Sequence, residues 1–478
     1  MTAALRAGGS AGTAVMRALR TPAGVRWLGF AGAVCCAIDA VLFGAPTWIR
    51  RGVSVASILR GPDGVLIMAL WILGLSALCA AWWLGRRLDV SRTWVLVTAA
   101  LWVVPLLFVP PLASRDMYAY ACQGALVGAG FNPSVDPIAA QPCPWIESVS
   151  VVWRTTPTPY GPLWILLSGL AASFGSQAVA LGIFRAYEVV ALIGLALALP
   201  PLARRLHVDE RRALWLVLCC PLVMVHFVGG GHNDTLAMAL LVAGLALIAG
   251  RRPAGLLVAG GALLGAAIMV KSTIGVVLPF AALLASGGLR DFTAFVRRGG
   301  AVVLGAVAFI GALSLGSGLG FGWATSLSGA GESRSWTSPA TAVGIAVNAV
   351  GKLVGADIDV VPAARTAALV VLLVALVVIW WRYRDADPLS GAGLALLAVI
   401  FLAPITQPWY LYWPLVLWAV ATAGTRWLDA AVIAVMFLIL PNGDGAWKPL
   451  QVPLAFAVTG LVIWVAWRSV RRLRTPVT

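Results

Sequence analysis

Fourteen runs of apolar residues dominate this sequence and limit what it can fold into. Only 11% of the 478 residues are charged, whereas 61% are hydrophobic. A helix needs roughly 20 apolar residues to cross the hydrocarbon of a bilayer, where the lipid cannot satisfy backbone polar groups. Continuous runs favour helices over the alternating strands of a transmembrane barrel. The pattern excludes a soluble globular protein and a disordered chain.

We therefore predict an all-α polytopic membrane protein, a single domain over residues 1–478, with about 12 to 14 transmembrane helices. The run over 161–200 is too long for one straight helix and should contain a break. The runs fall near residues 27–46, 64–84, 94–112, 161–200, 212–229, 233–250, 254–270, 272–287, 300–319, 363–382, 390–405, 409–424, 427–441 and 451–468.

The net charge of +16 is explained by the orientation of the chain in the membrane. With a cytoplasmic N-terminus, arginines gather in every second connection, for example around Arg86, Arg204 and Arg297. Cytoplasmic loops of membrane proteins carry such an excess, and contact with anionic lipid adds to the same tendency. The distribution predicts a multi-pass protein of the plasma membrane and favours orientation over nucleic-acid binding as its explanation.

The most polar connections then lie on the extracytoplasmic side. Two of them are long, 113–160 and 320–362, and three are short, 229–234, the position of Lys271, and 407–412. Membrane spanning does not explain these segments. Functional residues concentrate in loops held by a rigid scaffold, so we expect the functional site on this face.

A carboxylate followed by a helical pattern stands in the first outer loop. After Asp116, apolar residues recur at three- and four-residue spacing, which predicts a short interfacial helix on the membrane surface. A carboxylate is favourable near a helix N-terminus, so Asp116 could also be only a cap or the partner of Arg115. In the same loop, Cys122 and Cys143 could pair if the loop faces an oxidising compartment.

Two further outer positions combine charge with unusual surroundings. Glycines 229–231 precede His232, Asn233 and Asp234, and such a turn can let backbone amides approach an anion. A plain tight turn with an Asn or Asp cap is the alternative. Lys271 interrupts an apolar stretch, where a lysine must either pair with an anion or extend its amine to the interface.

Aromatic residues are frequent in the outer segments. Sugars present hydroxyls around apolar C–H faces, so aromatic rings beside a few polar groups suggest carbohydrate binding. An interfacial aromatic belt is the more common explanation for any single one of them. The residues are Tyr118, Tyr120, Trp145, Tyr160, Trp336, Trp409 and Tyr410.

The sequence resembles the GT-C class of integral-membrane glycosyltransferases, and most closely the actinobacterial polyprenol-phosphomannose-dependent α-(1→6)-mannosyltransferases of lipomannan and lipoarabinomannan synthesis. One departure is that two additional spans precede the loop with the acidic residue. The resemblance rests on the segments SRDMYAY at 114–120, Gln123-Gly124, Asn132-Pro133, YGPL at 160–163 and GHND at 231–234.

The resemblance implies that mannose moves from polyprenyl-phosphate-mannose to a mannan hydroxyl, with inversion, to give α-(1→6) linkages. One carboxylate suffices because a phosphate leaves as a stable anion, whereas glycosidases need two. Asp116 is then the general base. Expected phosphate-binding residues are Lys271, His232, Arg334 and Arg115. Expected sugar- and acceptor-binding residues are Tyr118, Gln123, Tyr160, Asn233, Asp234 and Trp409.

We expect no metal ion or organic cofactor, because few carboxylates cluster on the outer side. The expected partners are the lipid bilayer, the lipid-linked donor and a glycolipid or mannan acceptor, and no nucleic acid. Another GT-C transferase, with an arabinofuranose donor or a protein acceptor, remains an alternative. A lipid-linked sugar transporter or flippase is the alternative of a different class, although the sequence has no convincing internal repeat.

Overall fold

The computed structural model describes residues 17–43, 53–326, 334–421 and 424–474. Parts of three predicted segments lie outside these residues, namely 44–46, 327–333 and 422–423. The regular structure of the described residues is helical, with one isolated antiparallel bridge between Ile439 and Gly445. The predicted all-α class is confirmed.

The N-terminal half contains α2 (Pro22–Leu42), α3 (Val55–Leu59), α4 (Gly64–Gly85), α5 (Arg92–Leu107), α6 (Asp116–Gly128), η1 (Ile138–Ala140), η2 (Ile146–Ser148), α7 (Val151–Thr155), α8 (Pro162–Ala172), α9 (Gln177–Arg205), α10 (Glu210–Leu218), η3 (Val223–Gly229) and α11 (Asp234–Ile248). The C-terminal half contains α12 (Ala254–Val270), η4 (Ser272–Val277), α13 (Leu278–Ser286), α14 (Phe292–Ala294), η5 (Phe295–Gly299), α15 (Gly300–Gly316), α16 (Gly322–Ser326), α17 (Pro339–Leu353), α18 (Val361–Arg382), α19 (Pro388–Leu402), η7 (Pro408–Leu411), α20 (Tyr412–Ala419), α21 (Arg426–Val435), η8 (Met436–Leu438), η9 (Lys448–Leu450) and α22 (Gln451–Arg474). Two of the η elements, η3 and η5, are π-helices.

Short polar side chains determine where several helices begin. The hydroxyl of Ser91 accepts a hydrogen bond from the backbone N–H of Trp94 at the start of α5, and Asp387 accepts two such bonds at the start of α19. These side chains satisfy donors that a helix leaves unpaired at its N-terminus. The break expected within 161–200 is confirmed, because the run is divided between α8 and α9.

Six of the described helices are long and apolar enough to cross a membrane: α2, α4, α9, α14–α15, α18 and the first part of α22. A seventh span is obtained if α10 and η3, which meet at an angle of 58°, are counted as one broken span. Six further apolar helices have only 10–17 residues. The chain is therefore a multi-pass membrane protein, and the count of 12 to 14 spans stays a prediction.

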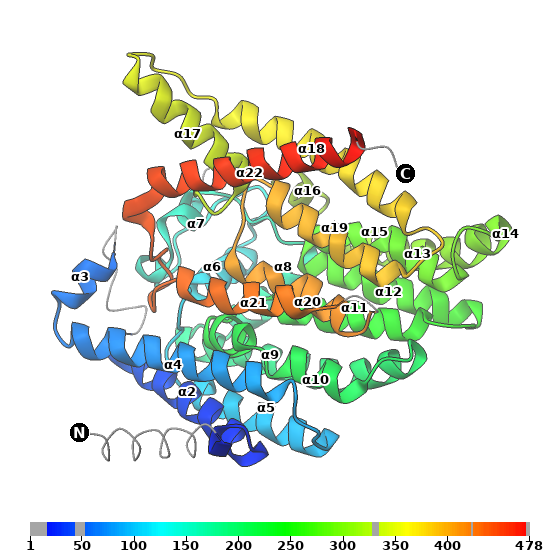
Figure 1. Ribbon diagram of the computed structural model, residues 1–478, viewed down its shortest axis with the longest axis horizontal. Coiled ribbons are helices and arrows are strands. Elements are labelled where there is room, and N and C mark those ends of the chain that lie inside the picture. The colour runs from blue at the N-terminus through cyan, green and yellow to red at the C-terminus, as the bar shows by residue number, and fades with distance from the viewer. Residues whose placement is uncertain (1–16, 44–52, 327–333, 422–423, 475–478) are drawn as a thin grey trace, which may run out of the picture.

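Glycines allow close packing between α12 and α15, which pair along their length (Figure 1). A Cβ atom added at Gly261 would lie 2.0 Å from the carbonyl oxygen of Val302, and one added at Gly305 would lie 2.0 Å from that of Val258. Small residues let helix backbones approach each other in this way in membranes. The pairing fixes α12, whose C-terminal end is followed directly by Lys271.

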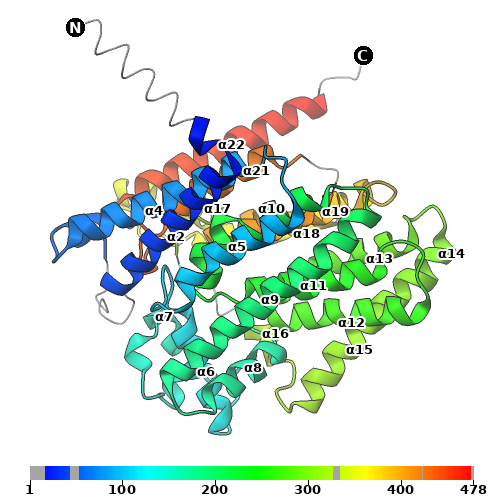
Figure 2. The same cartoon turned by 90° about the horizontal axis from the view of Figure 1, so that it is seen from below.

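The two long outer loops contact each other at one end of the molecule. The side-chain amide of Asn132 donates to the carbonyl of Leu319 at 3.0 Å, and the hydroxyl of Ser326 donates to the carbonyl of Thr158 at 2.8 Å. In Figure 2, α6, α7, α8 and α16 lie together at this end, and α22 lies at the opposite one. The start of the second loop, through Ser326, therefore lies beside the first loop, whereas α17, in the remainder of the second loop, packs against α22.

The short helix after Asp116 is confirmed as α6, but it does not lie on a surface. Nine of its 13 residues are buried, because it packs against α8 and α9 inside the protein. A Cβ atom at Gly124 would lie 2.0 Å from the carbonyl oxygen of Ser168, so α6 and α8 are in backbone contact. The three- and four-residue spacing predicted one apolar face for this helix. In the folded protein, neighbouring helices cover most of its surface, so the expectation of a helix on the membrane surface is wrong.

Candidate active site

Asp116 is the first residue of α6, and the segment before it is held from two directions. The N–H of Leu112 donates to the carbonyl of Gly229 at 3.0 Å, and the N–H of Ala113 donates to that of Pro441 at 2.6 Å. Ala113 has a φ of 56°, a left-handed conformation that is unfavourable for a residue with a Cβ atom. The chain thus turns sharply so that Asp116 starts the helix at a fixed place.

The carboxylate of Asp116 has a partner on each oxygen. Its Oδ2 lies 3.1 Å from Nδ1 of His232, and its Oδ1 accepts a hydrogen bond from Nε1 of Trp153 at 3.0 Å. The side chain remains 17% exposed. Burial alone raises the pKa of Asp116, but the hydrogen bond and charge of His232, followed by the charge of Lys271, hold that pKa below its ordinary value. The carboxylate is therefore ionised at neutral pH.

The glycine turn brings His232 to Asp116 through a close approach that only glycine permits. Gly231 has a φ of 69°, and a Cβ atom there would lie 2.2 Å from Cγ of Met117 in α6. The backbone N–H groups of Gly230 and Gly231 both donate to the carbonyl of Phe227 in η3. These amides are consequently not open to an anion. The idea of a phosphate-binding turn is wrong for them, because the π-helix supplies their acceptor.

Lys271 forms a buried ion pair with Asp234, so the expectation of an anionic partner is met. Its Nζ lies 3.2 Å from Oδ2 of Asp234, whose Oδ1 accepts a hydrogen bond from Nε1 of Trp413 at 2.7 Å. The ammonium also lies over the rings of Tyr410 and Tyr160, 4.9 and 5.6 Å from their centroids. Burial favours a neutral amine, but the charge of Asp234 raises the pKa of Lys271 above its ordinary value.

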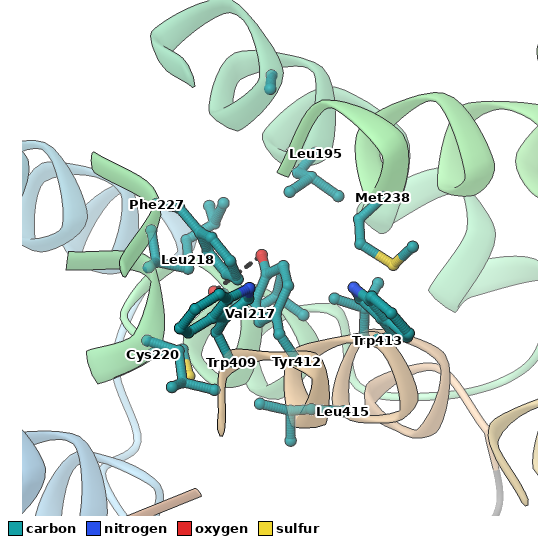
Figure 3. Close-up of a cluster of buried hydrophobic side chains, with 14 of the residues drawn as sticks. Leu195, Val217, Leu218, Cys220, Phe227, Met238, Trp409, Tyr412, Trp413 and Leu415 are labelled. Atoms are coloured by element: carbon teal, nitrogen blue, oxygen red, sulfur yellow. Dashed lines mark hydrogen bonds between the residues drawn. The ribbon is translucent and has the colours of Figure 1, made fainter. Parts of the chain in front are cut away.

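Trp409 connects His232 to the core of the protein. The two rings stack with their centroids 3.9 Å apart and an interplanar angle of 21°. Figure 3 shows Trp409, Tyr412 and Trp413 extending from η7 and α20 toward side chains of the facing helices, Phe227 and Met238 among them. The aromatic residues of this segment therefore serve the site and the core together, and Trp409 is not part of an exposed belt.

Two other sugar-binding candidates are engaged in buried hydrogen bonds within the protein, and only Tyr160 is also in contact with Lys271. The hydroxyl of Tyr160 lies 3.2 Å from that of Tyr120, and Oε1 of Gln123 accepts a hydrogen bond from Thr158 at 3.3 Å. Asn233 lies between His232 and Asp234 in the chain, and both of its side-chain amide atoms are buried without a hydrogen-bond partner. The amide of Asn233 is thus buried with its donor and acceptor atoms both unpaired.

Tyr118 and Arg334 are not brought to the Asp116 carboxylate in the structure. Tyr118 packs in a separate apolar cluster around Cys122 and Cys143. Arg334, half exposed, forms a two-pronged ion pair with Asp359 at 3.1 and 2.5 Å. Its guanidinium is therefore already paired with a carboxylate of the second outer loop, and Arg334 does not belong to the group of residues around Asp116.

Arg115 and the disulfide complete the surroundings of α6. Arg115 is partly buried and interacts electrostatically with Asp444 and Arg154. Cys122 and Cys143 form a disulfide with their Cα atoms 5.4 Å apart, which ties α6 to the loop that leads to α7. Among the described residues, no group of three or more His, Cys, Asp and Glu side chains could hold a metal ion.

Sequence reasoning missed three residues of this site: Trp153, Trp413 and His226. The two tryptophans donate to Asp116 and Asp234, and the ring of His226 lies 5.2 Å from that of Trp409. The spacing of Trp409 and Trp413, four residues apart, signals a shared helix face. No local signal marks Trp153 or His226, since each reaches the site from another element.

Comparison with known proteins identifies the family. A family model described as "Alpha-(1->6)-mannopyranosyltransferase, N-terminal domain" matches residues 26–287, and one described as "MptB C-terminal domain" matches residues 340–468. The chain belongs to the α-(1→6)-mannopyranosyltransferase family. It is accordingly a membrane-embedded glycosyltransferase, and the enzyme class expected from the resemblance is confirmed.

Individual relatives of this mannosyltransferase cover most of its length. The chain is 33% identical to Alpha-(1->6)-mannopyranosyltransferase A of Mycobacterium tuberculosis over 92% of this chain and 89% of the relative. It is 29% identical to Alpha-(1->6)-mannopyranosyltransferase A of Corynebacterium glutamicum over 84% of this chain and 89% of the relative. No solved structure matches the chain at a significant level.

Proposed function

We propose that this mannosyltransferase transfers mannose from polyprenyl-phosphate-mannose to a hydroxyl of a mannan acceptor and forms α-(1→6) linkages. The names of the relatives support the linkage. The reaction inverts the configuration at C1, from a β-linked donor to an α-linked product. The proposal includes no metal or organic cofactor, because few carboxylates cluster on the outer side of the chain, and the leaving phosphate, a stable anion, needs no second acidic residue to protonate it.

The carboxylate of Asp116 carries this proposal. It is ionised and partly exposed, and it lies beside His232, which is itself held in place, and within the influence of the charge of Lys271. Asp116 takes the proton from the acceptor hydroxyl while the acceptor oxygen bonds to C1. The bond between C1 and the phosphate oxygen breaks, and its electron pair leaves with polyprenyl phosphate.

Lys271 contributes positive charge near the reacting atoms. Its ammonium has three donors, of which Asp234 takes one, and the facing aromatic rings keep water away from the others. A fixed cation in such a site stabilises the charge that develops on the leaving phosphate. His232 orients Asp116 through Nδ1, and the buried amide of Asn233 contacts a sugar hydroxyl.

The active site faces the extracytoplasmic side of the plasma membrane. Two observations support this assignment: arginines gather in the connections of the other side, and the loop that carries Asp116 contains the disulfide between Cys122 and Cys143. Disulfides persist in oxidising compartments and are rare in the cytosol. The polyprenyl chain then stays in the bilayer while its sugar reaches the site.

The test compares mannose transfer by membranes that contain wild type or Asp116→Asn at equal protein levels, with a short α-(1→6)-mannoside as acceptor. We expect wild type to transfer mannose and the variant to lose at least about a hundredfold in rate, because asparagine keeps the shape but cannot accept the proton. Asp359→Asn, in the exposed ion pair with Arg334, is the matched control and should keep its rate.

Each of the other outcomes would contradict a different part of the proposal. A variant that retains most of the rate would remove Asp116 as the base while the enzyme class stands. If wild type uses polyprenyl-phosphate-arabinofuranose or a peptide acceptor instead, the donor or acceptor is wrong. Movement of the lipid-linked sugar across vesicles without transfer would favour the flippase alternative.

A further inference from the structure

Unpaired buried polar atoms gather around the ring of Trp409. They are Nδ1 and Nε2 of His226, Nε2 of His232 and Nε1 of Trp409, and the side-chain amide of Asn233, the residue that follows His232, is unpaired as well. The rings of His226 and His232 lie 6.3 Å apart, and each contacts Trp409. Buried polar groups in proteins nearly always have a hydrogen-bond partner. Such a concentration of exceptions in one place points to a ligand.

His226 is the most unusual member of this group. Its residue is 0% exposed, and neither ring nitrogen has a partner. It lies in the π-helix η3, the second half of the broken span, while its own backbone carbonyl accepts the N–H of His232 at 3.4 Å. π-Helical turns are rare and occur frequently at functional sites. The backbone thus places the imidazole beside the pair formed by Asp116 and His232.

The chemistry of an imidazole limits what this ligand can be. A neutral imidazole offers one donor and one acceptor, which is the pair of functions that a hydroxyl complements. A phosphate offers acceptors only, and Lys271 already supplies a cation elsewhere in the site. A sugar hydroxyl therefore fits His226 better than a phosphate oxygen does.

We propose that His226 binds a pyranose hydroxyl of the substrate, beside Nε2 of His232 and Nε1 of Trp409. The inference rests on the proposed function, because it assumes that a sugar occupies the site next to Asp116. The hydroxyl belongs either to the mannose of the lipid-linked donor or to the acceptor mannoside. His226 is accordingly a specificity-determining residue, since a site built to bond a hydroxyl rejects the analogue that lacks it.

The test combines His226→Phe with deoxy analogues of the two substrates. Phenylalanine keeps the ring against Trp409 and removes both nitrogens. Transfer rates are measured with polyprenyl-phosphate-mannose and its 2-, 3-, 4- and 6-deoxy forms, and separately with an α-(1→6)-mannoside and its deoxy forms. We expect wild type to disfavour one of these analogues by about tenfold or more, and His226→Phe to lose at least about tenfold with the parent sugar only.

The position of that analogue, in the donor or the acceptor series, identifies the source of the hydroxyl. Equal losses by His226→Phe with every sugar would overturn the inference and assign His226 to packing. His226→Gln, which restores a donor and an acceptor, should recover part of the discrimination, and it replaces His226→Phe if the latter does not accumulate in membranes. If wild type transfers no mannose at all, the proposed function itself fails.

Discussion

At the scale of single residues, Asp116 depends on partners that are distant in the sequence. His232 and Trp153 reach it from the glycine turn and from α7, and each bonds a different oxygen of the carboxylate. A carboxylate with both oxygens engaged has a fixed orientation, so in the proposed reaction an acceptor hydroxyl meets Asp116 in one geometry. Orientation of this kind is a large part of what an active site contributes to rate.

The depressed pKa of Asp116 gives a prediction about acid pH. Because the His232 contact is the largest influence that lowers this pKa, His232→Phe should raise it, while the aromatic ring still stacks on Trp409. The proposed role of Asp116 as general base requires its ionised form, so the acid limb of kcat/KM should move to higher pH, by about one pH unit or more. The measurement is the pH profile of mannose transfer by both proteins.

The lowered pKa of Asp116 also makes the stability of the fold depend on pH. A carboxyl whose pKa is lower in the folded protein stabilises the fold above its unfolded pKa, near about 3.9 for aspartate, and this stabilisation is lost as pH falls through the folded pKa. His232→Phe should lose it at a higher pH than wild type does. His207→Asn, at an exposed position in the connection between α9 and α10, is the control. An unmoved acid limb in His232→Phe would show that the histidine does not set the pKa of Asp116.

The limits of sequence reasoning are clearest at this scale. Asp116, His232 and Lys271 were accessible because a charged or titratable residue is unusual in an apolar chain. Trp153 was not, because a tryptophan has no distinctive local pattern in this chain. His226 is also titratable and lies in an apolar run, but its sequence neighbours do not show that its ring meets Trp409, since that contact is decided by how helices pack. The amides of Gly230 and Gly231 were misread for the same reason: their acceptor, the carbonyl of Phe227, exists only once the π-helix forms.

At the scale of elements, the pairing of α12 with α15 positions Lys271. Gly261→Leu should separate these helices, because a Cβ atom there meets the backbone carbonyl of Val302. Overpacking of this kind costs about 1–3 kcal/mol, which lowers the temperature of thermal denaturation by roughly 2–4 °C or more. Denaturation of the purified protein, together with its transfer rate, is the measurement.

Gly255→Leu is the matched control for this prediction. Gly255 belongs to the same helix, and nothing lies within 4 Å of a Cβ atom placed there. It should denature at the wild-type temperature. Equal destabilisation by both substitutions would mean that leucine acts through helix formation or membrane insertion, and the tight contact between α12 and α15 would not be the cause.

Elements differ in how well the sequence predicts them. The helix that begins at Asp116 was predictable from the three- and four-residue spacing after it, and the break between α8 and α9 from the length of the run over 161–200, which exceeds that of one straight span. The burial of α6 was not predictable, because it results from Gly124 meeting Ser168 across two helices. The same holds for the bend of 58° between α10 and η3, which the sequence presents as one continuous apolar run.

At the scale of the whole molecule, the orientation in the membrane can be tested with single cysteines. Gln141→Cys, exposed in the loop that carries Asp116, should react with a membrane-impermeant maleimide applied to intact cells. Arg290→Cys, exposed on a connection predicted to be cytoplasmic, should react only after the cells are opened. The native free cysteines are buried or partly buried, and wild type gives the background. The reverse labelling pattern would invert the topology.

The contact between Gly231 and Met117 has a consequence for motion. The glycine turn and α6 are in direct van der Waals contact, and His232 contacts Asp116 across the same junction. Asp116 and His232 are therefore held rigidly relative to each other. Neither can shift without displacing the other. The site is thus arranged before any sugar arrives, and little reorganisation energy is needed during the reaction. Substrates of the proposed reaction therefore meet an Asp116 carboxylate whose position is already set, and which stays partly exposed.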